Sequence, residues 1–224
     1  MKFKTTLLLK KNRNHNSKII NFLKSLKIFK IKKYYLQKND NLNFLKKEKI
    51  DVLISYLSPC IVPEKILNQV RILKINFHPG PPSYPGLGCY NFALLNNEKG
   101  YGVTAHEMSK RVDTGKIFKV KYFPIKTKEN VKTLIEKSYT QMFYLFKEIM
   151  LEFREKKVLS YSRDKWLRKP YSRKEFEKIF ELKNLNNKKH IFNLIRSTYL
   201  KGFNGPYIDL YGNKFIYSPN EKKK

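Results

Sequence analysis

The hydrophobic positions of this chain fall into short apolar runs that alternate with stretches of helical spacing. Apolar runs that predict strands occupy residues 3–9, 28–36, 50–56 and 72–77. Between them, apolar positions three and four residues apart predict helices over residues 19–26 and 63–70. The run at 50–56 is almost continuously apolar, which is typical of a strand buried on both faces. This alternation predicts a mostly parallel sheet with flanking helices.

The second half of the pattern begins with a loop. Residues 78–88 contain four Pro and three Gly, so they cannot form the interior of a helix or a strand. Two strands, 101–108 and 117–123, follow a short helix and are joined through a turn at 113–115. A long amphipathic helix is predicted over residues 130–156. The loop follows the carboxyl end of a strand, which is the edge where open α/β sheets bind ligands.

The last part of the chain has a different character. It holds the single Trp, two helical patches near 172–182 and 188–200, and two short strands around the turn Tyr211-Gly212-Asn213. We therefore expect an α/β, Rossmann-like domain over residues 1–159. Residues 160–224 are expected to form a small C-terminal extension of helices and a hairpin.

Charge changes this picture only slightly. The formal net charge is +30, from 48 Lys and Arg against 18 Asp and Glu, and only eight of the basic residues are Arg. Lys, Asn, Ile, Phe and Tyr are all abundant, and their codons are rich in A and T. A codon bias therefore explains much of the charge, and net charge bears on solubility rather than on fold. A nucleic-acid partner, such as tRNA, is not excluded.

The cysteines and the lengths of the apolar segments indicate the cellular compartment of the protein. Cys60 and Cys89 do not form a disulfide framework or a paired zinc motif, so no metal is expected. The apolar stretch near the amino terminus is too short for a signal peptide, and no stretch is long enough to span a membrane. The prediction is a cytoplasmic protein without a membrane partner.

Three polar residues lie at the ends of predicted strands. Asn76 and His78 are two positions apart, so they point to the same face of their strand. An imidazole moves protons near neutral pH, and an amide beside it can stabilise an oxyanion. Asp113 supplies a carboxylate that could orient His78 or help to move protons. This set fits acyl transfer without a covalent enzyme intermediate, but on spacing alone strand-end capping and an ordinary turn are commoner explanations.

Short motifs around these residues occur in a fixed order. They are Asn76-Phe77-His78-Pro79, Tyr84-Pro85-Gly86, Gly102-Val103-Thr104 and Val112-Asp113-Thr114-Gly115. In this order they resemble the formyltransferases that use 10-formyltetrahydrofolate, clearly over residues 50–125 and in outline over 1–49. The resemblance implies that residues 1–159 form a folate-binding catalytic domain.

The resemblance also implies residue roles. Asn76 would hold the formyl oxygen as it becomes an oxyanion, and His78 would share this role and pass a proton. Asp113 would organise His78 and a water and so assist deprotonation of the attacking amine. His106 is expected to have a structural or supporting role. Residues implied to bind the donor, 10-formyltetrahydrofolate, are Ser55, Leu57, Ser58, Pro59, Ile61, Arg111 and Val112.

The flanking segments bear on the acceptor. Residues 10–16 contain no Gly, unlike the phosphate-binding loop of glycinamide ribonucleotide formyltransferases. The segment after residue 160 is shorter than the barrel domain that methionyl-tRNA formyltransferases add. A short extension of this kind is similar to that of the sugar N-formyltransferases. This similarity implies a nucleotide-linked amino sugar, used in polysaccharide biosynthesis, as the acceptor.

Four residues of the extension are candidates for binding this acceptor. They are Trp166, Arg168, Tyr171 and Arg173. An aromatic ring can stack on a nucleobase and an Arg can pair with a diphosphate, although packing or a solvated turn explains each of them equally well. Alternatives are an enzyme that formylates methionyl-tRNA or glycinamide ribonucleotide, and a basic nucleic-acid-binding protein with an inert fold of this type. A homodimer through the C-terminal elements is possible.

Overall fold

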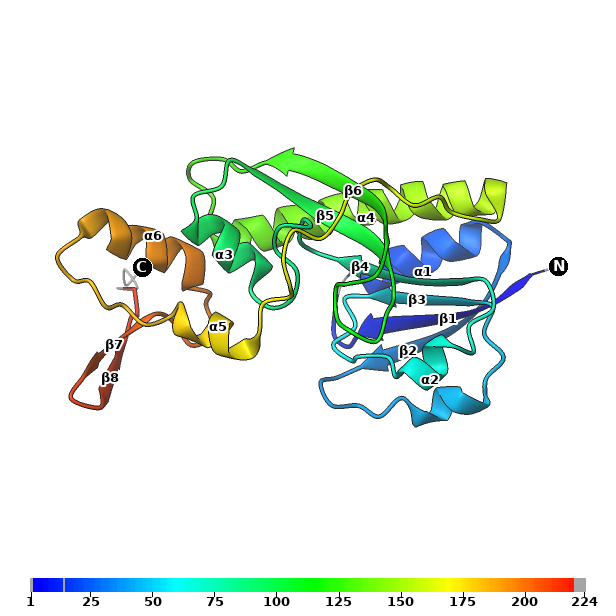
Figure 1. Cartoon of the computed structure of the whole chain (residues 1–224), viewed down its shortest axis with the longest axis horizontal. Helices are drawn as coiled ribbons and strands as arrows, with labels where there is room; N and C mark the ends of the chain where they lie inside the picture. The colour runs from blue at the N-terminus through cyan, green and yellow to red at the C-terminus, as the bar shows by residue number, and fades with distance from the viewer. Residues whose placement is uncertain (1, 14, 220–224) are drawn as a thin grey trace.

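The computed structural model describes residues 2–13 and 15–219. Its largest element is a six-stranded sheet with the strand order β2-β1-β3-β4-β5-β6 (Figure 1). These strands are β1 (Phe3–Lys10), β2 (Phe29–Leu36), β3 (Val52–Tyr56), β4 (Leu73–His78), β5 (Gly100–Glu107) and β6 (Ile117–Pro124). The first four strands of this order are parallel, whereas β5 runs antiparallel to both β4 and β6. The predicted α/β fold with a mostly parallel sheet is confirmed.

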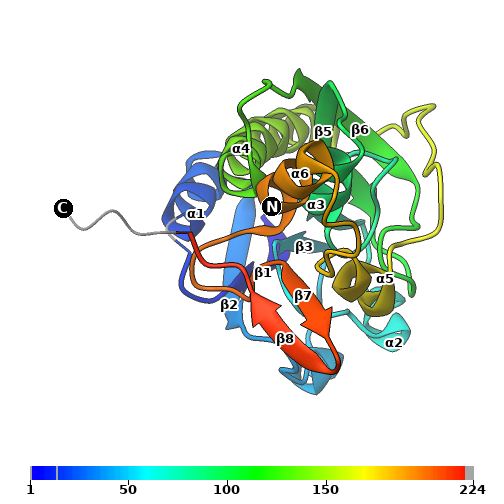
Figure 2. The same ribbon diagram turned by 90° about the vertical axis from the view of Figure 1, so that its left-hand side faces the viewer.

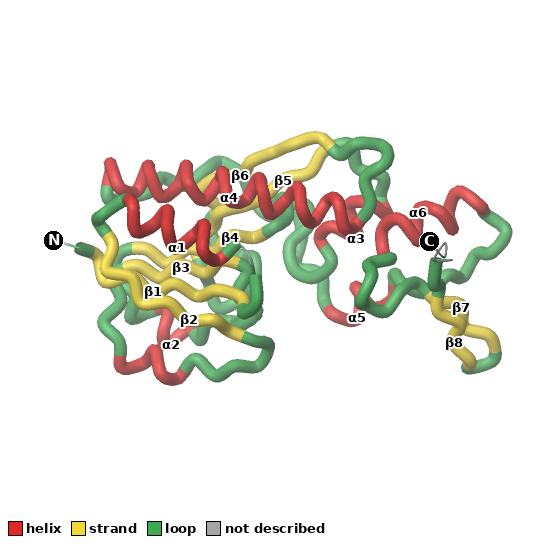
Figure 3. Tube along the Cα trace, turned by 180° about the vertical axis from the view of Figure 1, so that it is seen from behind, coloured by secondary structure: helices red, strands yellow, loops and turns green. Residues whose placement is uncertain are grey.

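Helices cover both faces of this sheet. On one face lie α1 (Asn16–Ser25) and the long α4 (Val131–Lys156), and α2 (Glu64–Leu67) lies on the other (Figure 3). A 3-10 helix, η1 (Asn43–Lys47), packs with α2. Helix α4 begins at a capping box in which the Asn130 side chain accepts a hydrogen bond from the N–H of the third helical residue. The prediction of a helix near 130–156 therefore agrees with the structure to within one residue.

The two covered faces explain the continuous apolar runs of the sequence. Successive residues of a strand point to opposite faces, yet Leu7, Leu8 and Leu9 of β1 are all fully buried. Leu7 and Leu9 belong to the hydrophobic cluster beneath α1 and α4, and Leu8 belongs to the opposite cluster with Leu45 and Ile66. A central strand therefore needs apolar side chains at every position, and the polar residues at its end are exceptions that require an explanation.

The C-terminal part lies beyond one end of the sheet (Figures 1 and 2). It contains α5 (Arg173–Lys178), α6 (Lys188–Thr198), β7 (Tyr207–Leu210) and β8 (Asn213–Ile216). The predicted hairpin is confirmed, whereas the helix expected near 172–182 is only six residues long. Helix α6 packs against α3 (Cys89–Leu95) of the sheet domain.

Between α4 and α5 the chain has neither helix nor strand, and we call residues 157–172 the strap. The strap crosses back over the sheet domain to α5, in yellow in Figure 1. Backbone hydrogen bonds attach it at Ser162 to Ile117, at Leu167 to Pro82, and at Tyr171 to Pro85. It therefore lies along the Pro- and Gly-rich loop of residues 78–88. Among the described residues, every helix is too short or too polar to cross a membrane.

Candidate active site

Four polar side chains meet where β4 and β5 lie side by side. Asn76 and His78 are on β4, and the antiparallel register places His106 opposite Asn76 and Thr104 opposite His78. Residues that are directly opposite in such a pair present their side chains on the same face. Asp113 comes to this face from the turn that joins β5 to β6. The pairing of two strands therefore brings an amide, two imidazoles and a carboxylate together.

The Asp113 carboxylate is held between the two imidazoles. Its Oδ2 lies 3.1 Å from His78 Nδ1, and its Oδ1 lies 3.2 Å from His106 Nε2. The backbone N–H of Gly86 donates a hydrogen bond of 2.8 Å to Oδ2. Burial by itself raises the pKa of Asp113, but these partners outweigh it and hold the pKa well below its usual range. Asp113 is therefore an ionised carboxylate in the interior, with 4% of its surface exposed.

His78 is a buried proton acceptor with both ring nitrogens directed at oxygen atoms. Nδ1 faces Asp113, and Nε2 lies 3.0 Å from the carbonyl oxygen of Tyr84. Burial lowers the pKa of His78, and the Asp113 charge only partly offsets this effect. The neutral ring has one N–H and can donate to only one of these two acceptors. A second proton on His78 would complete both hydrogen bonds.

The second imidazole fixes the orientation of Asn76. His106 Nδ1 lies 2.8 Å from the carbonyl oxygen of Glu107, and its Nε2 lies 3.0 Å from Asn76 Nδ2 and 3.2 Å from Asp113 Oδ1. With a proton Nε2 donates to the carboxylate, and without one it accepts from the Asn76 amide, so only one of these two contacts is a hydrogen bond at a time. The Asn76 amide has two N–H groups, and at most one is used by His106, so the other is left to donate to a ligand.

The turn that carries Asp113 is tightly constrained. Asp113 has a φ of 47°, in the left-handed region. A Cβ added at Gly115 would lie 1.9 Å from the carbonyl oxygen of Glu107, so only glycine fits there. The Ser109 and Thr114 hydroxyls both donate to the carbonyl oxygen of Arg111. The sequence Asp113-Thr114-Gly115 thus forms one rigid turn that fixes the position of the carboxylate.

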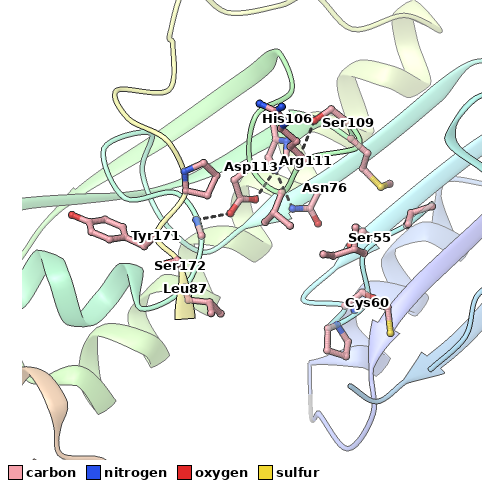
Figure 4. A pocket seen from close by; sticks show the side chains of 18 of the residues that line it. Ser55, Cys60, Asn76, Leu87, His106, Ser109, Arg111, Asp113, Tyr171 and Ser172 are labelled. Atoms are coloured by element: carbon pink, nitrogen blue, oxygen red, sulfur yellow. Dashed lines mark hydrogen bonds and ion pairs between the residues drawn. The ribbon is translucent and has the colours of Figure 1, made fainter. Parts of the chain in front are cut away.

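A cavity of about 560 Å³ opens in front of these groups (Figure 4). Asn76, His106 and Asp113 line one end of it, whereas His78 lies behind Asp113 and is 4% exposed. The walls come from the loop after β3, the loop after β4, the turn after β5, and residues 170–173 of the extension. The cavity is therefore built from four segments that are separate in the sequence.

Most of the residues expected to bind the donor lie on these walls. The lining includes Ser55, Ser58, Pro59, Ile61, Arg111 and Val112. Leu57 does not line the cavity, and it has a φ of 55° in the turn that follows β3. Their contact with a donor remains a prediction, but the structure brings all but one of them to the same cavity.

The residues expected to bind the acceptor are placed differently from one another. Arg173 is exposed and lines the cavity. Tyr171 also lines it, but its ring stacks at 3.7 Å on Phe92, and the Arg168 guanidinium lies 3.2 Å from the ring centroid. Groups at such distances must cover opposite faces of the ring, so a nucleobase would have to displace one of them.

The sequence does not predict the contacts that two residues, Trp166 and His106, make within the site. Trp166 donates its indole N–H to the carbonyl oxygen of Gly115 at 2.7 Å, and its ring meets both imidazoles edge to face. His106 was expected only to have a supporting role. The signal for His106 is its spacing of two from Thr104, which matches the spacing of Asn76 and His78 on the neighbouring strand.

Comparison with known proteins identifies the family. Residues 6–146 match the formyl transferase family, and the chain belongs to this family. It is 31% identical over 198 residues to the bifunctional polymyxin resistance protein ArnA of Wigglesworthia glossinidia brevipalpis. The match covers 86% of this chain and 30% of that protein. It is 30% identical over 187 residues to a methionyl-tRNA formyltransferase of Lactobacillus gasseri, which covers 80% of this chain and 57% of that protein. The chain thus spans less than two thirds of either relative.

Solved structures are similar over almost the whole chain. A sugar N-formyltransferase from a Shewanella species has a TM-score of 0.79 and 21% identity, with 96% of both chains covered. An N-formyltransferase from Helicobacter canadensis, solved with folinic acid and dTDP-3-aminofucose, has a TM-score of 0.73 and 18% identity, covering 95% of this chain and 86% of that one. At these identities the likeness establishes the fold, which includes the C-terminal extension.

Proposed function

We propose that this chain transfers a formyl group from 10-formyltetrahydrofolate to the primary amine of a nucleotide-linked amino sugar. The observation that carries the proposal is the Asp113 carboxylate, held between two imidazoles beside the Asn76 amide at the end of the cavity. Membership of the formyl transferase family supports the reaction type. The four side chains of this cluster are an amide, two imidazoles and a carboxylate, a set that fits direct attack by the amine on the formyl carbon.

The cavity fits a folate donor. Its volume of about 560 Å³ lies within the range of roughly 300–1,000 Å³ for small-molecule sites. Ile61, Leu87 and Val112 are exposed apolar side chains on its walls, and they offer contacts to a flat aromatic ring system. The exposed Arg111 on the same wall would pair with an anionic group. We assign the donor to this cavity, with its formyl end at Asn76.

The reaction needs an oxyanion donor and a proton acceptor. The amine nitrogen bonds to the formyl carbon while the carbonyl electron pair moves to oxygen, and the free N–H of Asn76 stabilises that negative charge. The attacking nitrogen then loses a proton to Asp113, which lines the cavity, and through Asp113 to His78, where the proton completes two hydrogen bonds. As the bond from the carbon to the folate nitrogen breaks, the proton passes to that leaving nitrogen. Protons and charge balance over the cycle.

The acceptor assignment rests on the extension. A structure named as a sugar N-formyltransferase, and an N-formyltransferase solved with dTDP-3-aminofucose, match this chain along nearly its full length, including the part beyond residue 146. We assign Arg173, which is exposed and lines the cavity, to the diphosphate of the acceptor. The hydrogen bonds and stacking of Trp166, Arg168 and Tyr171 indicate that they shape this side of the site, and contact of these three with the acceptor remains a prediction.

A methionyl-tRNA acceptor is the second candidate. It is favoured by the names of several relatives of about 30% identity and by the net charge of +30. A tRNA-binding enzyme of this charge would lose affinity steeply with rising salt concentration. A homodimer through the C-terminal hairpin, which exposes Tyr211, Phe215 and Ile216, also stays a prediction.

The experiment that tests the proposal measures tetrahydrofolate released from 10-formyltetrahydrofolate with a panel of amines. The panel contains dTDP-, UDP- and GDP-linked amino sugars, glycinamide ribonucleotide and methionyl-tRNA, with the His78→Ala protein as the blank. Turnover with a nucleotide sugar alone is expected. Turnover with methionyl-tRNA alone would overturn the acceptor, and no turnover by a protein that still binds folate would overturn the reaction.

A further inference from the structure

The single tryptophan of the chain occupies an unusual position. Trp166 lies on the strap, outside the residues that match the family, yet its ring is within the cluster of catalytic candidates. Ring centroids lie 5.1 Å from His106 and 5.9 Å from His78, with interplanar angles of 87° and 70°. One side chain of the extension thus contacts both imidazoles that hold Asp113.

The indole N–H reaches the turn that carries Asp113. It donates to the carbonyl oxygen of Gly115 at 2.7 Å. On its other side Gly115 packs against the carbonyl of Glu107 with no room for a Cβ. The turn is therefore clamped between β5 and Trp166. A shift of the indole would move Gly115, and with it the carboxylate two residues earlier in the chain.

The strap holds the indole firmly. The backbone N–H of Leu167 donates to Pro82 at 3.1 Å. On either side of Gly86, the N–H of Tyr171 donates to Pro85 at 2.9 Å and the N–H of Leu87 donates to Tyr171 at 3.2 Å. Gly86 is the residue whose N–H binds Asp113. The strap therefore supports both the turn and the loop that supply contacts to the same carboxylate.

We infer that Trp166 is a positioning residue: through its hydrogen bond to Gly115 and its edge-to-face contacts it fixes the Asp113 turn and covers the His78–His106 pair. The inference rests on the proposed function, because it assigns Trp166 a role in that reaction. Aromatic side chains exclude water from the groups they cover, and electrostatic interactions are stronger in a dry site. Trp166 thus acts through Asp113 and His78 and not by contact with the reacting atoms.

The charged groups around the imidazoles are few. Asp113 faces both rings from the turn, and each ring interacts with the other. The Cys89 thiol of α3 interacts with Asp113, and burial raises the pKa of Cys89 to about 12, so it stays protonated. Cys89 therefore adds no charge to this cluster near neutral pH.

Fluorescence tests the contact without any turnover. This chain has only one tryptophan, and the emission of an indole depends on the groups that touch its ring. The double variant His78→Gln/His106→Gln removes both ring contacts. At a fixed pH of 7.5 the emission spectrum of Trp166 is therefore expected to differ between this variant and the wild-type protein. Emission curves of the two proteins that superimpose would overturn the contact, even if the chain proves not to be a formyltransferase.

Kinetics test the positioning role. Trp166→Phe keeps an aromatic cover but loses the N–H donor, and we expect kcat to fall about 3–10-fold. Trp166→Ala loses both and should lower kcat by roughly 10²-fold, as for a small displacement of a catalytic group. KM for 10-formyltetrahydrofolate should change less than about 3-fold in both.

The matched control is Leu167→Ala. Leu167 neighbours Trp166 on the strap, but its side chain is 75% exposed, so kcat should stay at the wild-type value. The pH profile of kcat should also differ between Trp166→Ala and Leu167→Ala. In Trp166→Ala the uncovered His78 regains water, which weakens the burial that lowers its pKa. If Trp166→Ala keeps the wild-type kcat and pH profile, the inference is wrong. Loss of turnover in Leu167→Ala to the same extent would equally overturn it.

Discussion

Replacing Asp113 with Asn tests the electrostatic centre of the site. The substitution keeps the shape of the side chain and removes its charge. The carboxylate accepts from Gly86 N–H at 2.8 Å and faces His78 Nδ1 and His106 Nε2 at 3.1 and 3.2 Å. An amide has only one oxygen, so if this oxygen stays with Gly86 and His78, the NH₂ group faces His106 Nε2. As an acceptor that nitrogen can bind only one of this NH₂ group and the Asn76 amide, so one of the two donors must lose its hydrogen bond.

The magnitude follows from the charge that forms on His78. A unit charge 3.1 Å from the carboxylate interacts with it by about 5 kcal/mol at an effective dielectric constant of 20. A neutral amide replaces part of this with a hydrogen bond worth roughly 0.5–1.5 kcal/mol. A net loss of about 3–5 kcal/mol in the transition state corresponds to a fall in kcat of roughly 10²–10⁴-fold.

The assay measures kcat of Asp113→Asn by tetrahydrofolate release, together with urea unfolding at the same pH. Asp209→Asn is the matched control, because Asp209 is an exposed carboxylate of the hairpin. We expect the control to keep its activity and both proteins to fold. A kcat of Asp113→Asn within about 10-fold of wild type would refute the reasoning, since the buried charge would then contribute little to the transition state.

Three further predictions follow from the same geometry. Asn76→Ala removes the oxyanion donor and should lower kcat by about 10²–10³-fold with little change in KM, measured by steady-state kinetics. Gly115→Ala places a Cβ 1.9 Å from a backbone oxygen and should lower stability by about 3 kcal/mol in urea unfolding, whereas Gly100→Ala, where nothing lies within 4 Å, should not. Burial lowers the pKa of His78 in the folded state, so the unfolded chain takes up a proton first and stability falls as the pH drops below about 6.5. In His78→Gln the free energy of unfolding should fall less steeply with decreasing pH, by up to about 1.4 kcal/mol per pH unit. Urea unfolding at pH 7.5 and 5.5 measures this difference. Urea midpoints that are the same at both pH values in both proteins would contradict the burial argument.

The sheet could be predicted from the sequence because its signal is local. A strand covered on both faces must be apolar at every position, and Leu7, Leu8 and Leu9 show this directly. The placement of Asn76 beside His78 is equally local, since positions two apart on a strand share a face. Such features depend only on the period of the strand and need no knowledge of the neighbouring elements.

The contacts of His106 could not be predicted in this way. They depend on the antiparallel pairing of β5 with β4, which sets His106 opposite Asn76, and on an irregularity in the pairing with β6 at Ala105 and His106. An apolar run does not reveal the direction or register of its partner. For this reason the sequence predicts one imidazole at the site, whereas the structure has two on one carboxylate.

The acceptor candidates show a second limit. The sequence makes Tyr171 and Arg168 candidates because an aromatic ring can stack on a nucleobase and an Arg can pair with a diphosphate. The same side chains can equally stack and form ion pairs within the protein. Tyr171 lies between Phe92 and Arg168, and Arg168 pairs with Glu175 at 2.9 Å. Whether an aromatic or an Arg is free depends on the path of the strap, which has no periodic pattern to predict it.

The path of the strap also determines which residues could select the acceptor in the proposed reaction. The side chains that we propose to act on the formyl carbon lie within residues 6–146, the part that matches the family. The indole that covers both imidazoles and the wall of residues 170–173 come from outside it. Because backbone hydrogen bonds tie the strap to the loop of Pro82 and Pro85, a change in the extension reaches the carboxylate through Gly86 and Gly115. In the proposed reaction, a change in the extension that alters the choice of acceptor must therefore leave the position of the Asp113 carboxylate unchanged.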